Sequence, residues 1–114
     1  MRMAFYGTLR QGAANHYEVR NIEGEWSTGT VRGWLYEITW GPADGFPGIT
    51  LDAHAPPVEV DVLAGPGVEK NLGRIDDFEG PGYRRVSVAV TLLDGTLLDG
   101  TVVEAEIYEA DPEA

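Results

Sequence analysis

The strongest constraint on this chain is a repeated alternation of apolar and polar residues, in short stretches separated by glycine and proline. A period of two is the pattern of a β-strand with one buried face. Four stretches show it clearly, residues 1–6, 58–63, 83–92 and 101–108, and residues 48–51 are a shorter candidate. The 15 glycines and 7 prolines exceed the roughly 14 that average usage would give a chain of this length. They mark the turns between strands.

A sixth segment, residues 29–40, is apolar at both odd and even positions, which is typical of a strand covered on both faces. We therefore expect it to lie centrally in the sheet. Glycines such as Gly33 lie inside this strand, and tight curvature into a small barrel would account for them. Of the two Asp-Gly pairs that follow residue 92, we expect Asp94-Gly95, rather than Asp99-Gly100, to form the hairpin turn.

The period changes from two to helical after a Gly-Pro-Gly turn at residues 65–67, because Val68, Leu72 and Ile75 recur at i, i+4 and i+7. A second helix is expected over residues 13–20. About six strands with one or two helices, joined mostly by turns, predict an α+β fold, either a small mixed, mainly antiparallel β-barrel or a strongly curved sheet. The chain is expected to form one domain, residues 1–114.

Charge limits the partners of this chain. It has 8 basic and 19 acidic residues, a formal net charge of −11. Such a protein repels polyanions, so we expect neither a nucleic acid nor an anionic membrane surface as a partner. No apolar run reaches the roughly 18 residues of a spanning helix, and the expected location is cytoplasmic. Small molecules and proteins remain as partners.

The groups that many reaction classes require are missing. Cysteine is absent, and neither Ser27 nor Ser87 lies in a G-x-S-x-G motif, so an acyl-enzyme route is not expected. His16 and His54 lack neighbours at metal-ligand spacing, so we expect surface or capping roles for them and no metal site. The glycines match neither a dinucleotide-binding nor a phosphate-loop motif. We therefore expect no cofactor.

One residue breaks the amphipathic pattern of the predicted helix. At about 100° per residue, Glu79 falls on the same stripe as Val68, Leu72 and Ile75, which directs a carboxylate toward the core. A carboxylate in apolar surroundings is costly unless it is paired or protonated, and groups with strongly shifted pKa values gather at functional sites. Glu79 is therefore the first candidate for a functional residue.

A structural alternative stays open for this carboxylate. Gly80 would end the helix early, and the carboxylate would turn to solvent or pair with Arg84 or Arg85. The two preceding acidic residues, Asp76 and Asp77, fall nearer the rim of the helix, and we expect both to be solvated.

The second candidate is the segment Tyr6-Gly7-Thr8-Leu9, where the first strand runs into a turn. Gly7 is expected to permit a positive φ, so that consecutive N–H groups hold a carboxylate or carbonyl oxygen. Backbone donors bind a small anion whatever the net charge, and Arg10 would add to the field. The alternative is an ordinary turn at the end of a strand.

Together these segments resemble the γ-glutamylcyclotransferase-like superfamily, in its AIG2-like branch, over almost the whole chain. The N-terminal signature stands here as FYGTLRQGAANH at residues 5–16. The middle strand stands as VRGWLY at residues 31–36, followed by an aromatic-proline-small element, FPG, at residues 46–48. The second signature stands as IDDFEGPGYRR at residues 75–85.

The resemblance implies a role for particular residues. In that family the Tyr-Gly-Ser/Thr-Leu loop binds the glutamyl group, and the Glu of the Glu-Gly pair is the acid/base. Carried over to this chain, the substrate-binding residues are Tyr6, Gly7, Thr8 and Leu9, the catalytic residue is Glu79, and Arg10 and Tyr83 are auxiliary candidates.

The implied activity is γ-glutamyl cyclotransfer. The α-amine of a γ-glutamyl amide attacks its own γ-carbonyl, and 5-oxoproline and an amine or amino acid are released. This reaction uses a carboxylate as acid/base and no protein nucleophile, metal or cofactor, which suits the residues present. The alternative is a non-catalytic module that binds a small ligand or a protein on the same fold. Edge strands of a partly open sheet would allow a homodimer.

Overall fold

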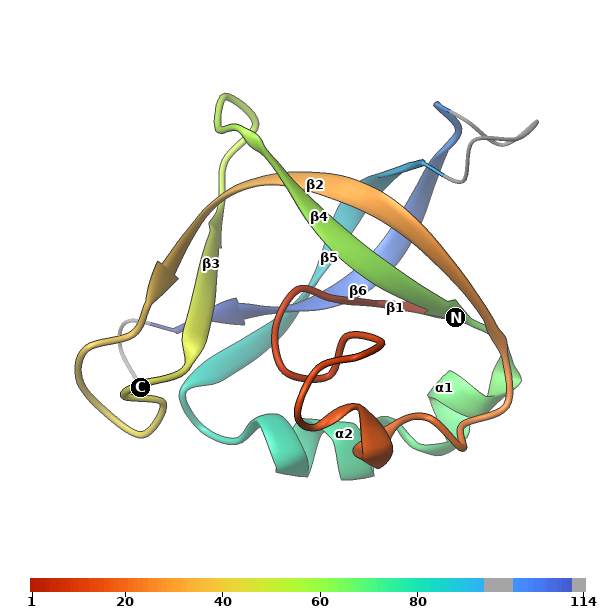
Figure 1. Cartoon of the computed structure of the whole chain (residues 1–114), viewed down its shortest axis with the longest axis horizontal. Coiled ribbons are helices and arrows are strands. Elements are labelled where there is room, and N and C mark those ends of the chain that lie inside the picture. The colour runs from red at the N-terminus through yellow and green to blue at the C-terminus, as the bar shows by residue number, and fades with distance from the viewer. Residues whose placement is uncertain (94–99, 112–114) are drawn as a thin grey trace.

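The computed structural model of the protein describes residues 1–93 and 100–111. Within these residues it has six strands, two α-helices and one 3-10 turn (Figure 1). The strands are β1 (Arg2–Phe5), β2 (Glu25–Glu37), β3 (Pro47–Leu51), β4 (Pro57–Ala64), β5 (Tyr83–Leu92) and β6 (Val102–Ala110). The helices are α1 (Pro66–Lys70) and α2 (Leu72–Glu79), and the 3-10 turn is His16–Glu18. The predicted Asp94-Gly95 turn lies outside the described residues. No helix in the described part of the chain has the length and apolar character to cross a membrane.

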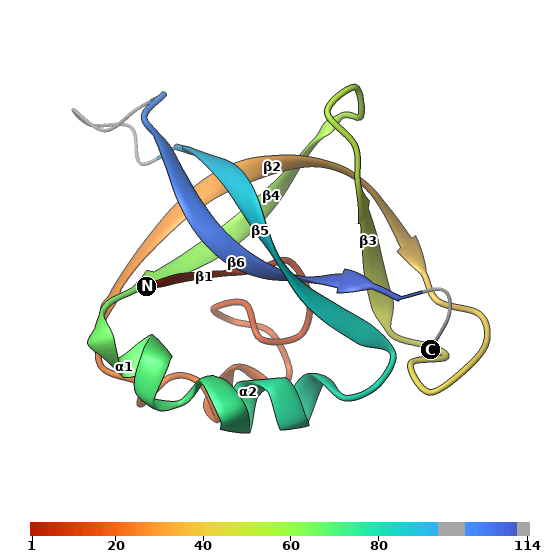
Figure 2. The same ribbon diagram turned by 180° about the vertical axis from the view of Figure 1, so that it is seen from behind.

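Five strands close into a barrel in the order β2-β4-β1-β6-β5, and β5 pairs again with β2. β3 extends the sheet beyond β2 as a sixth strand. β1 and β6 pair in parallel, whereas the other pairings are antiparallel. The predicted α+β fold with a small mixed, mainly antiparallel barrel is therefore confirmed. Both helices lie at one end of the barrel, together with the segment that follows β1 (Figures 1 and 2).

Strand alternation divides the buried side chains between two cores. On β1, Ala4 belongs to one core, while Met3 and Phe5 belong to the other. The core inside the barrel consists of Ala4, Val31, Ile49, Val60, Val62, Val90, Leu92, Ala105 and Ile107. The core between the barrel and the helices consists of Met3, Phe5, Leu9, Val19, Ile22, Leu63, Val68, Ile75 and Tyr108. The second core fixes α2, and thereby Glu79, against the end of β1.

Glycines inside β2 lie where other strands approach closely. Gly29 pairs with Leu92 at the point where β5 closes the barrel. A Cβ atom on Gly29 would lie 2.6 Å from Val90 Cγ1, and one on Gly33 would lie 2.8 Å from Ile49 Cγ1. Both distances are too short for a side chain. The Gly29 contact lies where β5 closes the barrel, as the barrel prediction requires, whereas Gly33 makes room for Ile49 of β3, outside the five barrel strands.

The prediction that residues 29–40 are covered on both faces is wrong for the second half of that segment. Trp34 and Leu35 are each 52% exposed, and Tyr36 is 41% exposed. The reason is that β2 continues past the barrel, where it pairs with β3 alone. Its central position is observed, because β2 pairs with β3, β4 and β5.

The helical predictions also need correction. The apolar stripe from residue 68 to residue 79 is split into two helices at Asn71, whose Nδ2 donates to the Gly67 carbonyl oxygen at 2.8 Å and closes α1. The helix expected over residues 13–20 is reduced to the turn His16–Glu18. Its hydrogen bonds join residues three apart, as from the Val19 N–H to the His16 carbonyl, whereas those of an α-helix join residues four apart.

Candidate active site

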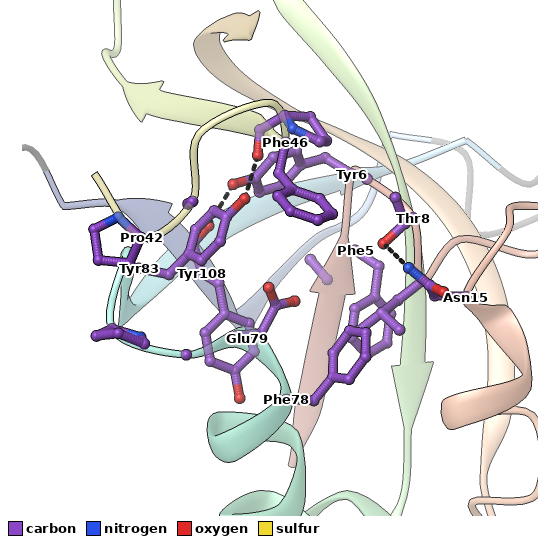
Figure 3. Close-up of a pocket in the computed structure, with 17 residues that line it drawn as sticks. Phe5, Tyr6, Thr8, Asn15, Pro42, Phe46, Phe78, Glu79, Tyr83 and Tyr108 are labelled. Atoms are coloured by element: carbon purple, nitrogen blue, oxygen red, sulfur yellow. Dashed lines mark hydrogen bonds between the residues drawn. The ribbon is translucent and has the colours of Figure 1, made fainter. Parts of the chain in front are cut away.

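A cavity of about 410 Å³ lies beside the C-terminal end of β1 (Figure 3). Its walls come from the end of β1 with the following loop, the loop before β3 with the first residue of β3, the end of α2 with the two residues after it, and one residue each of β5 and β6. The lining residues are Ala4 to Leu9, Asn15, Pro42, Ala43, Phe46, Pro47, Phe78 to Pro81, Tyr83 and Tyr108. The two segments that the sequence singled out, residues 6–9 and Glu79, thus line one cavity although they are far apart in the chain.

Glu79 is the last residue of α2, and Gly80 ends the helix with a φ of 77°, which favours glycine. Its predicted direction is confirmed, because Ile75, one turn earlier, is 1% exposed in the core and Glu79 lines the cavity. Figure 3 shows the carboxylate pointing into the space between Tyr83 and Phe5. Burial in these surroundings raises the pKa of Glu79 from 4.5 to about 7, because the charged form loses hydration.

The two arginines considered as partners of Glu79 bind elsewhere. Arg84 Nη2 lies 3.0 Å from Glu109 Oε1, and Arg85 Nε lies 3.0 Å from Asp76 Oδ1. An ion pair between Glu79 and either arginine is therefore not observed. Within residues 1–93 and 100–111, no cation pairs with the Glu79 carboxyl to lower its pKa.

The expectation that Asp76 and Asp77 are both solvated is wrong for Asp76. Asp76 is half-buried and accepts hydrogen bonds from the Tyr108 hydroxyl and from Arg85. Asp77 is exposed, as expected. The positions of the two residues around the helix did not reveal this difference, because Tyr108, the partner of Asp76, lies on β6, far along the chain.

Two side chains of the segment after β1 are held in place by hydrogen bonds. The Tyr6 hydroxyl donates to the Tyr108 carbonyl oxygen at 2.7 Å, and burial raises the pKa of Tyr6 far above its ordinary value. Thr8 Oγ1 accepts a hydrogen bond from Asn15 Nδ2 at 3.0 Å. This bond leaves the Thr8 O–H as a donor toward the cavity that the residue lines.

The backbone of this segment differs from the expectation. Gly7 does not have a positive φ. The space around Gly7 is tight instead, since a Cβ atom would lie 3.0 Å from Pro47 Cγ. The N–H groups of Gly7, Thr8 and Leu9 have no hydrogen-bond acceptor among the described residues. They remain as donors for an anionic or carbonyl oxygen, while the Leu9 side chain is 3% exposed in the core.

Arg10 is not a lining residue of the cavity. Its Nη2 lies 2.6 Å from Glu59 Oε1 and 3.2 Å from Asp61 Oδ1. Asp61 is 4% exposed and also accepts the Gln11 N–H at 2.7 Å. Two carboxylates therefore offset the positive charge that Arg10 was expected to contribute to the site. The ion pairs instead hold the segment after β1 against β4.

Tyr83, the other auxiliary candidate, lines the cavity, and its hydroxyl donates to the Pro47 carbonyl oxygen at 2.6 Å. Burial, with the nearby carboxyl of α2, raises the pKa of Tyr83 to about 12. The sequence did not identify Tyr108, Phe78 or Asn15 as cavity residues. Phe78 and Asn15 lie within the recognised motifs, whereas Tyr108 lies in a strand with no motif and carried no signal.

The histidines lie outside the cavity lining. His16 Nδ1 lies 2.9 Å from the Leu9 carbonyl oxygen, and its ring packs edge-on against Trp26 with centroids 5.1 Å apart. His54 is exposed. Among residues 1–93 and 100–111, no three His, Asp or Glu side chains are grouped to hold a metal ion.

The cavity therefore combines one carboxyl, which titrates near neutrality, with backbone and hydroxyl donors on another wall. Such a carboxyl can take a proton from a bound group and return it to another. Donors that are already in place can stabilise charge that develops on a carbonyl oxygen. This arrangement suits proton-coupled chemistry at an amide or ester.

Several solved structures have a fold similar to that of this chain. Similar solved structures include an uncharacterized protein of Pyrococcus horikoshii, with TM-score 0.66 and 22% identity over 96% of this chain and 77% of that chain. An AIG2-like protein of Mus musculus has TM-score 0.63 and 22% identity over 98% of this chain and 80% of that one. A protein of Arabidopsis thaliana has TM-score 0.71 and 20% identity over 99% and 70% of the respective chains. These likenesses show the fold.

No protein with a curated description matches the sequence. The model of one family, described as gamma-glutamyl cyclotransferase, AIG2-like, matches residues 3–114. Because this match spans nearly the whole sequence, the chain belongs to the AIG2-like γ-glutamyl cyclotransferase family.

Proposed function

We propose that this protein is a γ-glutamyl cyclotransferase, which converts a γ-glutamyl amide into 5-oxoproline and a free amine or amino acid. The observation that carries the proposal is the Glu79 carboxyl, with a pKa of about 7, in the same cavity as the segment Tyr6–Leu9. At neutral pH such a carboxyl is present in both protonation states, so it can act as base and then as acid.

The reaction follows from this one group. The Glu79 carboxylate takes a proton from the α-ammonium of the substrate, and the freed amine attacks the γ-carbonyl carbon. A carbon–nitrogen bond forms, and negative charge moves onto the carbonyl oxygen. As the bond to the leaving nitrogen breaks, Glu79 returns its proton to that nitrogen. The ring nitrogen keeps one hydrogen and passes the other to the carboxylate, from which it goes to solvent.

The segment after β1 would hold the glutamyl group in the folded shape that ring closure requires. Its donors are the N–H groups of Gly7, Thr8 and Leu9 and the Thr8 hydroxyl, which Asn15 orients. Well-oriented intramolecular reactions gain roughly 7–11 kcal/mol from proximity. Positioning therefore supplies much of the acceleration in this proposal, and Glu79 supplies the proton transfers.

The test is formation of 5-oxoproline from a panel of γ-glutamyl amides, γ-glutamyl amino acids and γ-glutamyl peptides, measured by mass spectrometry. The matched variants are Glu79→Gln and Asp77→Asn, since each removes one carboxylate from α2 with little change of shape. Asp77 is exposed and lies outside the cavity lining. We expect Glu79→Gln to lose about 10²–10⁴ in rate, the usual worth of a general acid/base, and Asp77→Asn to keep the wild-type rate.

If every member of the panel stays intact, the proposed activity is wrong. Thermal stabilisation by 5-oxoproline, glutamate or γ-glutamyl compounds without turnover would then favour a non-catalytic module that binds a small ligand. Equal loss in both variants would also count against the proposal, because it would indicate a general effect of charge on α2.

A further inference from the structure

A second, smaller cavity lies outside the proposed active site. It has a volume of about 150 Å³ and is formed by the end of β2, the loop that follows it, the residue before β5 and the end of β6. β2 runs past the barrel, and this loop lies beside the end of β6 (Figures 1 and 2). Pro42 and Ala43 of the loop line both cavities, so the two cavities share this part of the loop as a wall.

The floor of the second cavity is apolar and held by the backbone. Ile38 and Ala110, which both line it, meet over Gly48 of β3. A Cβ atom on Gly48 would lie 2.8 Å from Ile38 Cγ1 and 3.0 Å from Ala110 Cβ. The Asp111 N–H donates to the Gly82 carbonyl oxygen at 3.0 Å, which holds the end of β6 against the residue before β5. The floor therefore offers apolar contact to a ligand.

Two aromatic side chains line the same cavity and remain exposed. Trp40 is 67% exposed and Tyr36 is 41% exposed. The Tyr36 hydroxyl shares a hydrogen bond with Thr50 Oγ1, 3.2 Å away, which fixes the position of its ring on the sheet. Large aromatic residues that stay exposed beside a concave surface mark a place that a ligand covers.

The charged groups of the second cavity are acidic. Glu37 and Asp111 are among its lining residues, all of which the structure describes, and no lysine, arginine or histidine lines it. The Glu37 carboxylate is exposed and forms no ion pair with another residue of the described part of the chain. The net charge of −11 adds to the negative field. These surroundings favour a positively charged ligand.

We propose that the second cavity binds a small organic ammonium ion whose nitrogen carries alkyl groups, with the cation against the rings of Trp40 and Tyr36 and near the Glu37 carboxylate. An alkylated ammonium has few N–H groups, so aromatic faces and negative charge bind it in place of hydrogen bonds. Its alkyl groups suit the apolar floor. A metal ion would instead require several oxygen ligands, and within residues 1–93 and 100–111 no three acidic or histidine side chains are grouped to supply them.

The test is an NMR titration of the wild-type protein with choline and with 3,3-dimethylbutan-1-ol, which has the same shape but carbon in place of the charged nitrogen. We expect choline to bind roughly fivefold more tightly than the alcohol. The signals of the Trp40 indole N–H and the Gly82 amide should shift, whereas the Gly7 and Thr8 amides of the proposed active site should not. The titration is repeated with Glu79→Gln, because the carboxylate there could also attract a cation, and we expect the same affinity.

Matched variants test which groups bind the cation. Trp40→Leu removes one aromatic ring and should weaken choline binding by roughly fivefold, and Glu37→Gln should weaken it by roughly twofold because an exposed charge is screened. The controls are Trp34→Leu and Glu25→Gln, which make the same changes elsewhere on β2. Trp34 is 52% exposed, Glu25 is exposed at the other end of the strand, and neither lines the cavity. Both controls should keep the wild-type affinity.

Several results would overturn the proposed ammonium site. Equal affinity for choline and the alcohol would show an apolar site without preference for a cation. Shifts confined to Gly7 and Thr8 that disappear in Glu79→Gln would place the cation in the other cavity. No saturable shift with choline, or equal losses in Trp40→Leu and Trp34→Leu, would also contradict the site. None of these results depends on cyclotransferase activity.

Discussion

The hydroxyl of Tyr108 on β6 donates a hydrogen bond to the carboxylate of Asp76 on α2, at 2.5 Å. Arg85 on β5 binds the same carboxylate. Two strands of the barrel are thus tied to the helix that ends in Glu79. The position of the proposed acid/base therefore depends on the barrel as well as on the apolar stripe of the helix.

Asp76→Ala is expected to destabilise the protein by ~1–3 kcal/mol, because it leaves the partly buried Tyr108 hydroxyl without its acceptor. Asp77→Ala, at the next position on an exposed side chain, should change the free energy of unfolding by less than about 0.5 kcal/mol. Urea denaturation of both variants at pH 7 measures the difference. Equal effects would mean that the Tyr108 contact contributes nothing to stability.

Glu79 should lower stability as pH rises. Its pKa is raised from 4.5 to about 7 by folding, so the folded state binds the proton more tightly than the unfolded chain. The free energy of unfolding therefore falls between about pH 4.5 and 7 and loses nothing further above that range. The full cost of ionisation is ~3 kcal/mol.

Glu79→Gln removes that ionisation but keeps the shape of the side chain. At pH 8 the variant should therefore melt at a higher temperature than the wild type, and the difference should shrink toward pH 4. Scanning calorimetry of the two proteins across this range measures it, and other charges cancel in the comparison. A Gln variant that is less stable at pH 8 would indicate a stabilising partner for the carboxylate.

Gly7→Val should damage substrate binding far more than Thr8→Ser. The added side chain starts 3.0 Å from Pro47 Cγ, so the loop or Pro47 must move, whereas serine retains the hydroxyl. A displacement of this kind costs about 10² in kcat/KM, and we expect most of it in KM. A folded Gly7→Val protein with unchanged KM would show that the segment does not bind the glutamyl group.

Replacing a glycine by alanine should have opposite effects on stability at the closure of the barrel and on α2. Gly29→Ala should destabilise by ~1–3 kcal/mol, because its Cβ would lie 2.6 Å from Val90 Cγ1 and 2.8 Å from the Thr91 carbonyl oxygen. Gly73→Ala, on α2 with nothing within 4 Å of the added carbon, should stabilise by ~0.5 kcal/mol through helix propensity. Thermal unfolding of both variants checks the sign of each effect.

Local patterns were sufficient for much of the fold and for the candidate site. Burial of one strand face imposes a period of two, so residues 83–92 could be assigned to a strand whose bounds match β5. The direction of Glu79 followed from Leu72 and Ile75 because all three lie on one short helix. Closure into a barrel was anticipated from glycines inside strands such as Gly33, although the glycine at the closure itself is Gly29, and Gly33 makes room for Ile49 of β3.

Local sequence patterns could not predict contacts between segments that are far apart in the chain. Asp76 was expected to be solvated because its partner, Tyr108, lies on the last strand. The glycine at position 7 was attributed to φ, whereas the structure shows instead a close approach of Pro47 from the start of β3. The break at Asn71 depends on a side-chain hydrogen bond that apolar spacing does not reveal.

The most direct test of the role of Glu79 is the pH dependence of kcat/KM for 5-oxoproline formation, in the wild type and in Glu79→Gln. The wild-type value should rise with pH and reach half its plateau near pH 7, where Glu79 ionises. The Gln variant should be slower by about 10²–10⁴ and should lack this rise. A wild-type midpoint near the ordinary carboxyl value of 4.5, or a Gln variant with the wild-type rate and profile, would contradict the assignment of Glu79 as the acid/base.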